Sequence, residues 1–236
     1  FVGILLAVGV IALLEYLDNT VKEHTNIQDL THAPLLSSIP VNSGIQRGSR
    51  QVYSIADTKS AAAEAINLLR TNVTFAGIGK PIKSMAITSS VAGEGKSTVT
   101  ANLAIAFAKS GKSVVIIDAD LRKPTQHRIF GVANSFGVTN YVTDANTDWT
   151  ALSHRVALPG LTLIASGPIP PNPAEMVASE RFKSLVKDLE SRFDYVLIDN
   201  PPILQASDGL ALGSFTDGII LVTRYGNTRI DALKSA

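Results

Sequence analysis

The sequence predicts an α/β fold, a doubly wound and mostly parallel sheet of the P-loop NTPase type with Walker A, A′ and B elements. Two observations support this prediction. Runs of Val, Ile and Leu alternate with helical patterns over residues 84–223, as in parallel sheets that are covered on both faces. The first run leads directly into Gly93-Glu94-Gly95-Lys96-Ser97, a glycine-rich stretch typical of the turn between a strand and a helix.

The composition excludes several classes of protein. The 236 residues include 21 Lys and Arg against 20 Asp and Glu, and this near balance excludes a strongly basic nucleic-acid binder. The absence of cysteine excludes disulfide scaffolds, thiolate zinc sites and cysteine nucleophiles. The four histidines are scattered along the chain, so the sequence shows no cluster of metal ligands.

Residues 1–14 are apolar and carry no charge. As a helix they would reach about 21 Å, which is short of the hydrocarbon layer of a bilayer at roughly 30 Å. We expect them to be the cytosolic end of a transmembrane helix whose beginning lies outside this sequence; a buried core helix is the alternative. A signal peptide is disfavoured because there is neither a basic segment before the apolar stretch nor a small-residue cleavage site after it.

Residues 15–55 have the composition of a juxtamembrane linker, since Pro, Gly and other turn-forming residues interrupt them repeatedly. Within the linker, residues 35–39 are a candidate strand that docks on the following domain. A helix is expected over residues 59–71, with Ser60 as its N-cap. Its apolar face is expected to contain Ala61, Ala65, Leu68 and Leu69.

The remaining elements follow from the alternation of apolar runs and helical patterns. We expect strands over residues 84–88, 113–118, 161–165, 194–199 and 218–223, and helices over residues 96–109, 181–192 and 209–215.

The loop after the first of these strands has the chemistry of a phosphate-binding site. A strict P-loop has the pattern GxxxxGK[ST], and here only the first Gly is replaced, by Ser90. Glycines let backbone N–H groups point at phosphate oxygens, and the helix N-terminus adds its positive end. Lys96 is expected to reach the β- and γ-phosphates and the Ser97 hydroxyl to bind Mg²⁺; a glycine-rich turn without a ligand is the disfavoured alternative. The predicted nucleotide-binding residues are Ala92, Gly93, Glu94, Gly95, Lys96, Ser97 and Thr98.

Aspartates stand at the ends of two further strands. Asp118 and Asp120 follow one apolar run, and Asp199 ends another, just before a Pro-Pro turn. Because ligands of doubly wound sheets collect at the carboxyl ends of the strands, we expect these carboxylates beside the phosphates. Asp199 can hold Mg²⁺ through a water molecule. Solvated acids in ordinary turns are the alternative, which the preceding P-loop disfavours.

These motifs resemble those of the bacterial tyrosine kinases (BY-kinases) that regulate capsule and exopolysaccharide assembly. The resemblance covers nearly the whole chain and rests on the P-loop with its non-Gly first position, on Asp118-x-Asp120-x-Arg122 and on Asp199-x-Pro-Pro. Partition and septum-positioning ATPases carry a signature lysine where this chain has Val91, and the guanine-reading Asn-Lys-x-Asp of related GTPases is absent. ATP is therefore the expected nucleotide.

The resemblance implies an ATP-dependent protein-tyrosine autokinase. In that mechanism Lys96 neutralises the transferred phosphate, and Asp118 orients the tyrosine hydroxyl or accepts its proton. Mg²⁺ is the implied cofactor, with Ser97, Asp120 and Asp199 in its shell. Two alternatives stay open: a nucleotide-switch ATPase without kinase activity, and a scaffolding subunit of a polysaccharide co-polymerase.

The resemblance also implies partners and a location. The expected partners are a membrane-embedded polysaccharide co-polymerase segment, in the same chain or in a second one, and a tyrosine phosphatase; no nucleic acid is expected. The kinase domain, residues 56–236, is expected on the cytoplasmic side of the bacterial inner membrane.

In this family a helix with the pattern Glu-x-x-Arg-x-x-Arg builds a ring of kinase subunits. The matching residues here are Glu64, Asn67 and Arg70, so the middle arginine is missing. Asn brings neither a charge nor a bidentate fork for a carboxylate. We therefore expect a weakened ring-forming homo-oligomer, and mainly monomers of residues 55–236 in dilute solution.

The tyrosine-rich C-terminal tail that serves as phosphate acceptor in the family is absent from this sequence. We expect the tyrosines near the fold to be packed, and self-phosphorylation of this chain to be low. The tyrosines of this sequence are Tyr16, Tyr53, Tyr141, Tyr195 and Tyr225.

Overall fold

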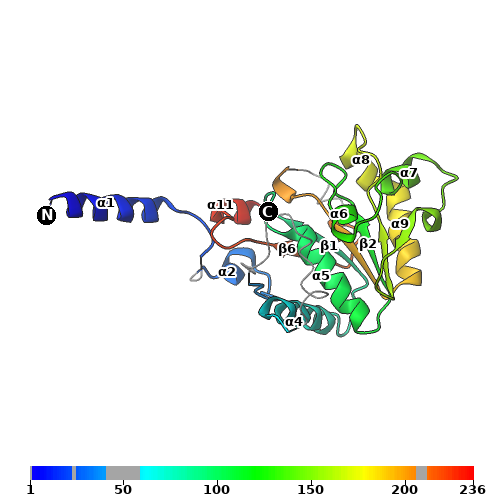
Figure 1. The fold of residues 1–236 in the computed structure, drawn as a ribbon, viewed down its shortest axis with the longest axis horizontal. Coiled ribbons are helices and arrows are strands. Elements are labelled where there is room, and N and C mark those ends of the chain that lie inside the picture. Colours follow the sequence, from blue (N-terminus) through cyan, green and yellow to red (C-terminus); the bar gives the residue numbers. More distant parts are fainter. Residues whose placement is uncertain (1, 23–24, 41–58, 206–211) are drawn as a thin grey trace.

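A computed structural model describes residues 2–22, 25–40, 59–205 and 212–236 (Figure 1). Its centre is a six-stranded sheet in the order β3-β4-β2-β5-β1-β6, in which every described pairing is parallel except that of β3 with β4. The strands are β1 (Ser84–Ser89), β2 (Val114–Asp118), β3 (Ser153–Arg155), β4 (Leu161–Ile164), β5 (Tyr195–Asp199) and β6 (Gly218–Val222). The five predicted strands are confirmed, with ends that differ by at most one residue.

Helices cover both faces of this sheet, as a doubly wound fold requires. α4 (Ala61–Ala76) and α5 (Lys96–Lys109) pack on one face, and α9 (Glu180–Arg192) packs on the other. Shorter helices lie in the connections: α2 (Ile27–Thr31), α6 (Gln126–Phe130), α7 (Val138–Thr143), α8 (Pro173–Ala178) and α11 (Ile230–Ser235), with the 3₁₀ turns η1 (Trp149–Leu152) and η2 (Ile203–Gln205).

The burial of the central strands explains why continuous apolar runs in the sequence predicted them. All residues of β1 and β2 are buried, because each strand is covered on both sides. Successive side chains therefore alternate between two cores: Ile87 packs towards α4 and α5, whereas Ala86 packs towards α9. Continuous apolar runs are the consequence of this double burial.

Residues 35–39 dock on the domain but do not form a strand, so that part of the prediction was wrong. Leu36 and Ile39 pack against the core beneath α4 and α5. Side chains fix the segment: the Asn72 amide donates to the Leu36 carbonyl at 2.6 Å, and the Ser37 hydroxyl donates to the Ala65 carbonyl at 2.8 Å. The neighbour is a helix, whose backbone groups are already paired and offer no ladder to a strand.

The N-cap of α4 is confirmed, since the Ser60 hydroxyl accepts the Ala63 N–H at 3.2 Å. Of the predicted apolar face only Leu69 is fully buried and Ala65 is half-buried, whereas Ala61 and Leu68 are exposed, Leu68 to 52%. The helix turns its other apolar positions to the core, and the buried residues are Ala62, Ala63, Ile66, Leu69 and Val73.

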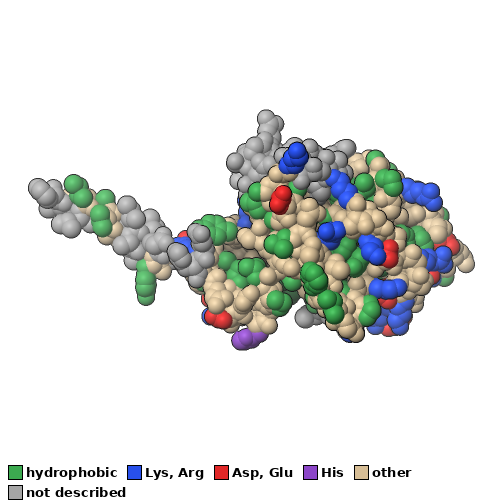
Figure 2. Space-filling model, turned by 90° about the horizontal axis from the view of Figure 1, so that it is seen from below, with side chains coloured by type: hydrophobic (Ala, Val, Ile, Leu, Met, Phe, Trp, Pro, Cys, Tyr) green, Lys and Arg blue, Asp and Glu red, His purple; other side chains and the backbone are tan. Residues whose placement is uncertain are grey.

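The N-terminal helix α1 (Val2–Leu17) stands away from the domain with apolar side chains on its surface (Figures 1 and 2). Ile4, Leu6 and Val8 are all more than half exposed. Within the described residues, none of the helices combines the length and the apolar character needed to span a bilayer. The assignment of residues 1–14 to a membrane segment stays a prediction.

The stretch after α1 pairs with the end of the chain. Thr20 and Arg229 form an antiparallel bridge, the Val21 N–H donates to the Thr228 carbonyl at 2.8 Å, and the Gly226 N–H donates to the Val21 carbonyl at 2.9 Å. The stretch after α1 therefore meets the C-terminal segment, whereas the start of α1 lies far from it (Figure 1). Three predicted features fall outside the described residues in whole or in part: the linker from residue 41 to 55, Tyr53, and residues 209–211 of the helix expected over 209–215.

Candidate active site

The P-loop runs from β1 into α5 at the carboxyl edge of the sheet, where the ends of β2 and β5 also lie. Gly93 and Gly95 adopt φ values of 87° and 100°, in the left-handed region that favours glycine. A Cβ atom at either position would meet nothing within 4 Å, so the space beside the loop is open. The loop is thus bent in the way that turns backbone N–H groups towards a bound anion.

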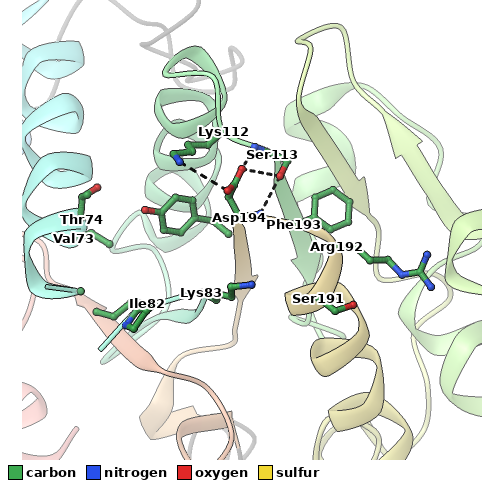
Figure 3. A pocket seen from close by; sticks show the side chains of 13 residues that line it. Val73, Thr74, Ile82, Lys83, Lys112, Ser113, Ser191, Arg192, Phe193 and Asp194 are labelled. Atoms are coloured by element: carbon green, nitrogen blue, oxygen red, sulfur yellow. Dashed lines mark hydrogen bonds and ion pairs between the residues drawn. The ribbon is translucent and has the colours of Figure 1, made fainter. Parts of the chain in front are cut away.

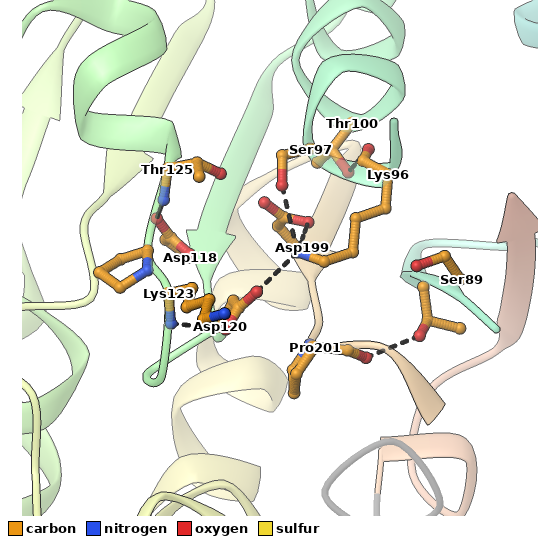
Figure 4. A network of polar contacts seen from close by, with 12 residues as sticks. Ser89, Lys96, Ser97, Thr100, Asp118, Asp120, Lys123, Thr125, Asp199 and Pro201 are labelled. Atoms are coloured by element: carbon orange, nitrogen blue, oxygen red, sulfur yellow. Dashed lines mark hydrogen bonds and ion pairs between the residues drawn. The ribbon is translucent and has the colours of Figure 1, made fainter. Parts of the chain in front are cut away.

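Lys96 lies among the carboxylates at the strand ends (Figure 4). Its Nζ donates to Asp120 Oδ2 at 2.8 Å, to Asp199 Oδ1 at 3.3 Å and to Ser97 Oγ at 3.2 Å. Burial alone would lower the pKa of Lys96, but the negative charges of Asp199 and Asp120 outweigh it and raise the pKa above its ordinary value. Lys96 is therefore a buried ammonium ion whose partners are two of the three predicted aspartates.

Asp118 is fully buried beside Asp199, its register partner in the pairing of β2 with β5. Its Oδ2 accepts the N–H groups of Thr125 at 3.1 Å and Gln126 at 3.0 Å, whereas its Oδ1 is buried without a hydrogen-bond partner. Burial, followed by repulsion from Asp199, raises the pKa of Asp118 to about 8. The carboxyl group is held firmly by one oxygen and has the other available.

Gln126 is a part of this site that sequence reasoning missed. Its Nε2 donates to Asp199 Oδ2 at 2.7 Å and to the Ser97 carbonyl at 3.0 Å. No periodic pattern marks this residue, since it belongs to a five-residue helix that follows a turn. One sequence signal could have found it: Gln126 follows Asp120 by only six residues, and the loop after β2 lies beside the P-loop at this edge of the sheet.

The side chain of Glu94 points back into the protein and holds the P-loop from behind. Its Oε2 accepts the Val91 N–H at 3.1 Å, and its Oε1 accepts a hydrogen bond from the hydroxyl of the buried Thr228. Arg224 donates to the Gly93 carbonyl at 3.1 Å. The segment after β6 is thus a second support of the P-loop that the sequence did not indicate.

The predicted metal ligands lie together, with Lys96 between Asp120 and Asp199. In the part of the chain that the structure describes, no three Asp, Glu, His or Cys side chains form a metal-binding group. Mg²⁺ commonly uses only one or two carboxylates and takes further oxygens from substrate phosphates. The Ser97 hydroxyl and the carboxylates of Asp120 and Asp199 are hard oxygen donors of this kind. The residues present therefore fit Mg²⁺ bound together with a nucleotide.

The predicted oligomerisation residues lie on α4, apart from the P-loop. Glu64 and Asn67 are exposed, and Arg70 is half-buried. The structure thus leaves Glu64 and Asn67 on the surface, as an intermolecular role requires, and their role stays a prediction.

The tyrosines divide into two groups. Tyr195 stacks on Phe107, with ring centroids 3.9 Å apart, and the Arg181 guanidinium lies 4.3 Å from the ring centre of Tyr141. Tyr16, on the protruding α1, and Tyr225 are 87% and 67% exposed, so the expectation that tyrosines near the fold are packed was wrong for Tyr225. Tyr16 lies near the end of α1, and Tyr225 lies in the turn between β6 and α11.

A cavity of about 410 Å³ opens at the opposite end of the sheet, near the starts of β1, β2 and β5 (Figure 3). Lys83, Lys112 and Asp194 line it together with Tyr195, and Asp194 accepts the Ser113 N–H at 2.8 Å. None of the predicted site residues lines this cavity.

Comparison with known proteins assigns this geometry to a family. A family model described as ParA, the NUBPL iron-transfer P-loop NTPase, matches residues 81–225. The tyrosine-protein kinase YwqD of Bacillus subtilis (strain 168) is 42% identical over 182 residues, which cover 77% of this chain and 76% of the relative. The tyrosine-protein kinase ptk of Acinetobacter johnsonii is 29% identical over 99% of this chain and 32% of the relative. The kinase domain of the Escherichia coli tyrosine kinase ETK has a TM-score of 0.84 at 25% identity, covering 91% of this chain and 88% of that domain.

The family model describes the nucleotide-binding fold, whereas both relatives and the solved structure are tyrosine kinases. Without cysteine, this chain lacks the thiolates that hold iron–sulfur clusters. The chain belongs to the bacterial tyrosine kinase (BY-kinase) family of capsule and exopolysaccharide biosynthesis, on the fold of the ParA-like P-loop NTPases, and it is a protein-tyrosine kinase.

Proposed function

We propose that this kinase transfers the γ-phosphoryl group of ATP to tyrosine hydroxyls at the site formed by the P-loop, Asp118, Asp120 and Asp199. The observation that supports this proposal is the meeting of the buried Lys96 ammonium with carboxylates from two strand ends. Phosphoryl transfer depends on positioning and on neutralisation of charge more than on a strong base. A rigid, buried cluster at the mouth of a P-loop supplies both.

Each group in the cluster has a task in this proposal. The P-loop N–H groups and Lys96 hold the phosphates and neutralise them. In its ionised form Asp118 receives the hydrogen of the tyrosine hydroxyl at the partnerless Oδ1, while the N–H groups of Thr125 and Gln126 keep the carboxyl group oriented. Mg²⁺, held by Ser97 together with Asp120 and Asp199, supplies further charge neutralisation when it is bound.

The proposed place of this reaction is the cytoplasmic face of the bacterial inner membrane. One observation favours it: α1 carries exposed apolar side chains. Residues 15–55 then act as the linker from the membrane to the kinase domain at 56–236. The kinase regulates polymerisation and export of the polysaccharide there, next to a co-polymerase segment and a tyrosine phosphatase.

The test of the proposed site is Lys96→Met. Removal of one charge-stabilising group from such a site commonly reduces the rate about 10²–10³-fold. We expect ATP turnover and phosphorylation of an added tyrosine-rich peptide to fall by this factor, while Lys183→Met, which removes a surface cation paired with Glu180, leaves both unchanged. Near-normal rates in Lys96→Met would contradict the P-loop assignment, and turnover without peptide phosphorylation in the unaltered protein would favour the nucleotide-switch alternative.

A further inference from the structure

Gln126 connects three parts of the active site. Its backbone N–H holds Asp118 at the end of β2, and its side chain reaches the Ser97 carbonyl at the start of α5 and Asp199 at the end of β5. The residue is fully buried. It is therefore fixed relative to Ser97 and Asp199, two of the three residues that are proposed to hold the metal.

The contacts determine which way the amide of Gln126 faces. The Ser97 carbonyl and the Asp199 carboxylate are both acceptors, so the group between them is the NH₂ donor. The amide oxygen Oε1 then points elsewhere, and it is buried without a hydrogen-bond partner. A buried acceptor without a partner costs about 1–3 kcal/mol, so a donor that arrives with a ligand is favoured there.

The surroundings indicate the chemistry of that donor. Oε1 belongs to the same planar group as Nε2, and Nε2 lies within 3.0 Å of both Ser97 and Asp199. When a divalent cation is bound at Ser97 and Asp199, a water molecule of its hydration shell would be a strong hydrogen-bond donor to Gln126 Oε1. Mg²⁺ keeps several of its waters when it binds to proteins, so such waters are expected at the site.

We propose that Gln126 is a positioning residue for the metal: it holds Asp199 beside Ser97 and accepts a hydrogen bond from a metal-bound water through Oε1. This inference rests on the proposed metal site at Ser97 and Asp199. Groups that orient metal ligands in this way commonly change metal affinity about 10–100-fold when they are removed.

The test is Gln126→Met, which retains most of the side-chain volume and removes both hydrogen-bonding atoms. The measured quantity is the affinity for a fluorescent ADP analogue, titrated with and without Mg²⁺. We expect the metal-free affinity to stay within about twofold of that of the unaltered protein, while the gain in affinity on adding Mg²⁺ falls roughly tenfold. Thr139→Val is the matched control, because its Oγ1 is also buried without a partner and the residue lies on α7, among none of the groups assigned to the site.

A second variant tests the inference independently, in case Gln126→Met does not fold. Gln126→Asn retains the amide but is shorter by one methylene group, so it cannot reach Asp199 and Ser97 together, and it should show the same selective loss. An unchanged Mg²⁺ gain in either folded variant would overturn the inference. An equal loss of affinity with and without Mg²⁺ would also overturn it, since that result describes a residue needed only for packing.

Asp199→Asn tests the proposed metal site itself, on which the inference about Gln126 depends. In the unaltered protein Mg²⁺ should increase the affinity, and Asp199→Asn should abolish that increase. If Asp199→Asn keeps the full Mg²⁺ effect, the metal assignment itself is wrong and the role of Gln126 falls with it. If Asp199→Asn loses the effect and Gln126→Met keeps it, the metal site stands and only the inference about Gln126 fails.

Discussion

Asp118 and Lys96 lie in one cluster of charged side chains but have opposite electrostatic surroundings. Both are buried, but the Lys96 ammonium has two carboxylate partners, whereas one oxygen of Asp118 has none. Asp118 was predicted from its place at a strand end. The structure adds a reason for the role that we propose for it, on the tyrosine hydroxyl rather than on the metal. The charged partner of Asp199 is Lys96, whereas for Asp118 burial and repulsion from Asp199 outweigh the attraction of the Lys96 ammonium.

Asp118→Asn should reduce transfer to tyrosine more than it reduces the affinity for Mg·ATP. In our proposal Asp118 acts on the acceptor hydroxyl, whereas Ser97 and Asp199 hold the metal. Initial rates of peptide phosphorylation and titration with an ATP analogue measure the two effects separately. Equal losses in both would make Asp118 a metal residue instead.

The pH dependence of stability gives a second test of Asp118. Because burial and Asp199 raise the pKa of Asp118 from 3.8 to about 8, the folded protein keeps a proton that the unfolded chain releases. The corresponding contribution to stability is complete below pH 3.8 and is lost as the pH rises through about 8. In protein without nucleotide and metal, the free energy of unfolding should fall over this range, and fall less in Asp118→Asn. Identical slopes in chemical denaturation of the two proteins would refute this assignment.

At the scale of elements, the P-loop is supported by the segment that follows β6. The Thr228 hydroxyl donates to Glu94 and accepts the Arg224 N–H at 2.7 Å, while Arg224 reaches the Gly93 carbonyl. The curvature of the P-loop therefore depends on residues more than 120 positions away in sequence as well as on its own glycines. A local motif describes the loop but not what keeps it rigid.

Thr228→Val should weaken nucleotide binding although Thr228 lies outside the P-loop motif. Loss of a hydrogen bond to a buried charged group costs about 1.5–3 kcal/mol, and part of this cost falls on the loop conformation that binds phosphate. We expect a lower melting temperature and a several-fold weaker ADP affinity, measured by calorimetry. Thr228→Ser keeps the hydroxyl and should restore the affinity; if both variants bind equally, the hydroxyl is not responsible.

Helix α4 is the element on which assembly is expected to depend. The exposed Glu64 and Asn67 can face a second copy, but Asn67 brings no charge to the contact. Charge pairs that remain exposed are worth less than about 1 kcal/mol, so the ring should be weak. Light scattering should show mainly monomers of residues 55–236, and Asn67→Arg should shift them towards larger species. A stable oligomer that Asn67→Arg does not change would show that other contacts build it.

For the molecule as a whole, double burial and strand order explain what could be predicted. The central strands are apolar along their length, and the carboxyl ends of parallel strands meet at one edge, which brought Asp118 and Asp199 together as expected. Gln126 and Thr228 could not be found in this way, because they reach the site across 73 and 134 positions of sequence and belong to no periodic pattern. The strand β3 was missed because three half-buried or exposed polar residues carry no strand signal.

The pairing of residues 19–21 with residues 226–230 attaches the start of the linker to the end of the kinase domain. The Gly226 and Ile230 N–H groups donate to the carbonyls of Val21 and Asn19, both at 2.9 Å. Deletion of residues 1–22 should speed hydrogen exchange at these two amides. The Thr228 amide, whose acceptor is the Arg224 carbonyl, should serve as the unaffected reference. Unchanged exchange at Gly226 and Ile230 would show that the pairing does not persist in solution.

The position of Lys96 has a consequence for the order in which ligands bind. Its ammonium is a resident counter-ion for Asp120 and Asp199, so a divalent cation that enters alone must compete with it. Phosphates offer the ammonium another partner, and their arrival releases the carboxylates. Nucleotide and metal must then raise each other's affinity by the same factor, since coupling between two ligands is reciprocal. The nucleotide-free kinase should accordingly bind free Mg²⁺ weakly.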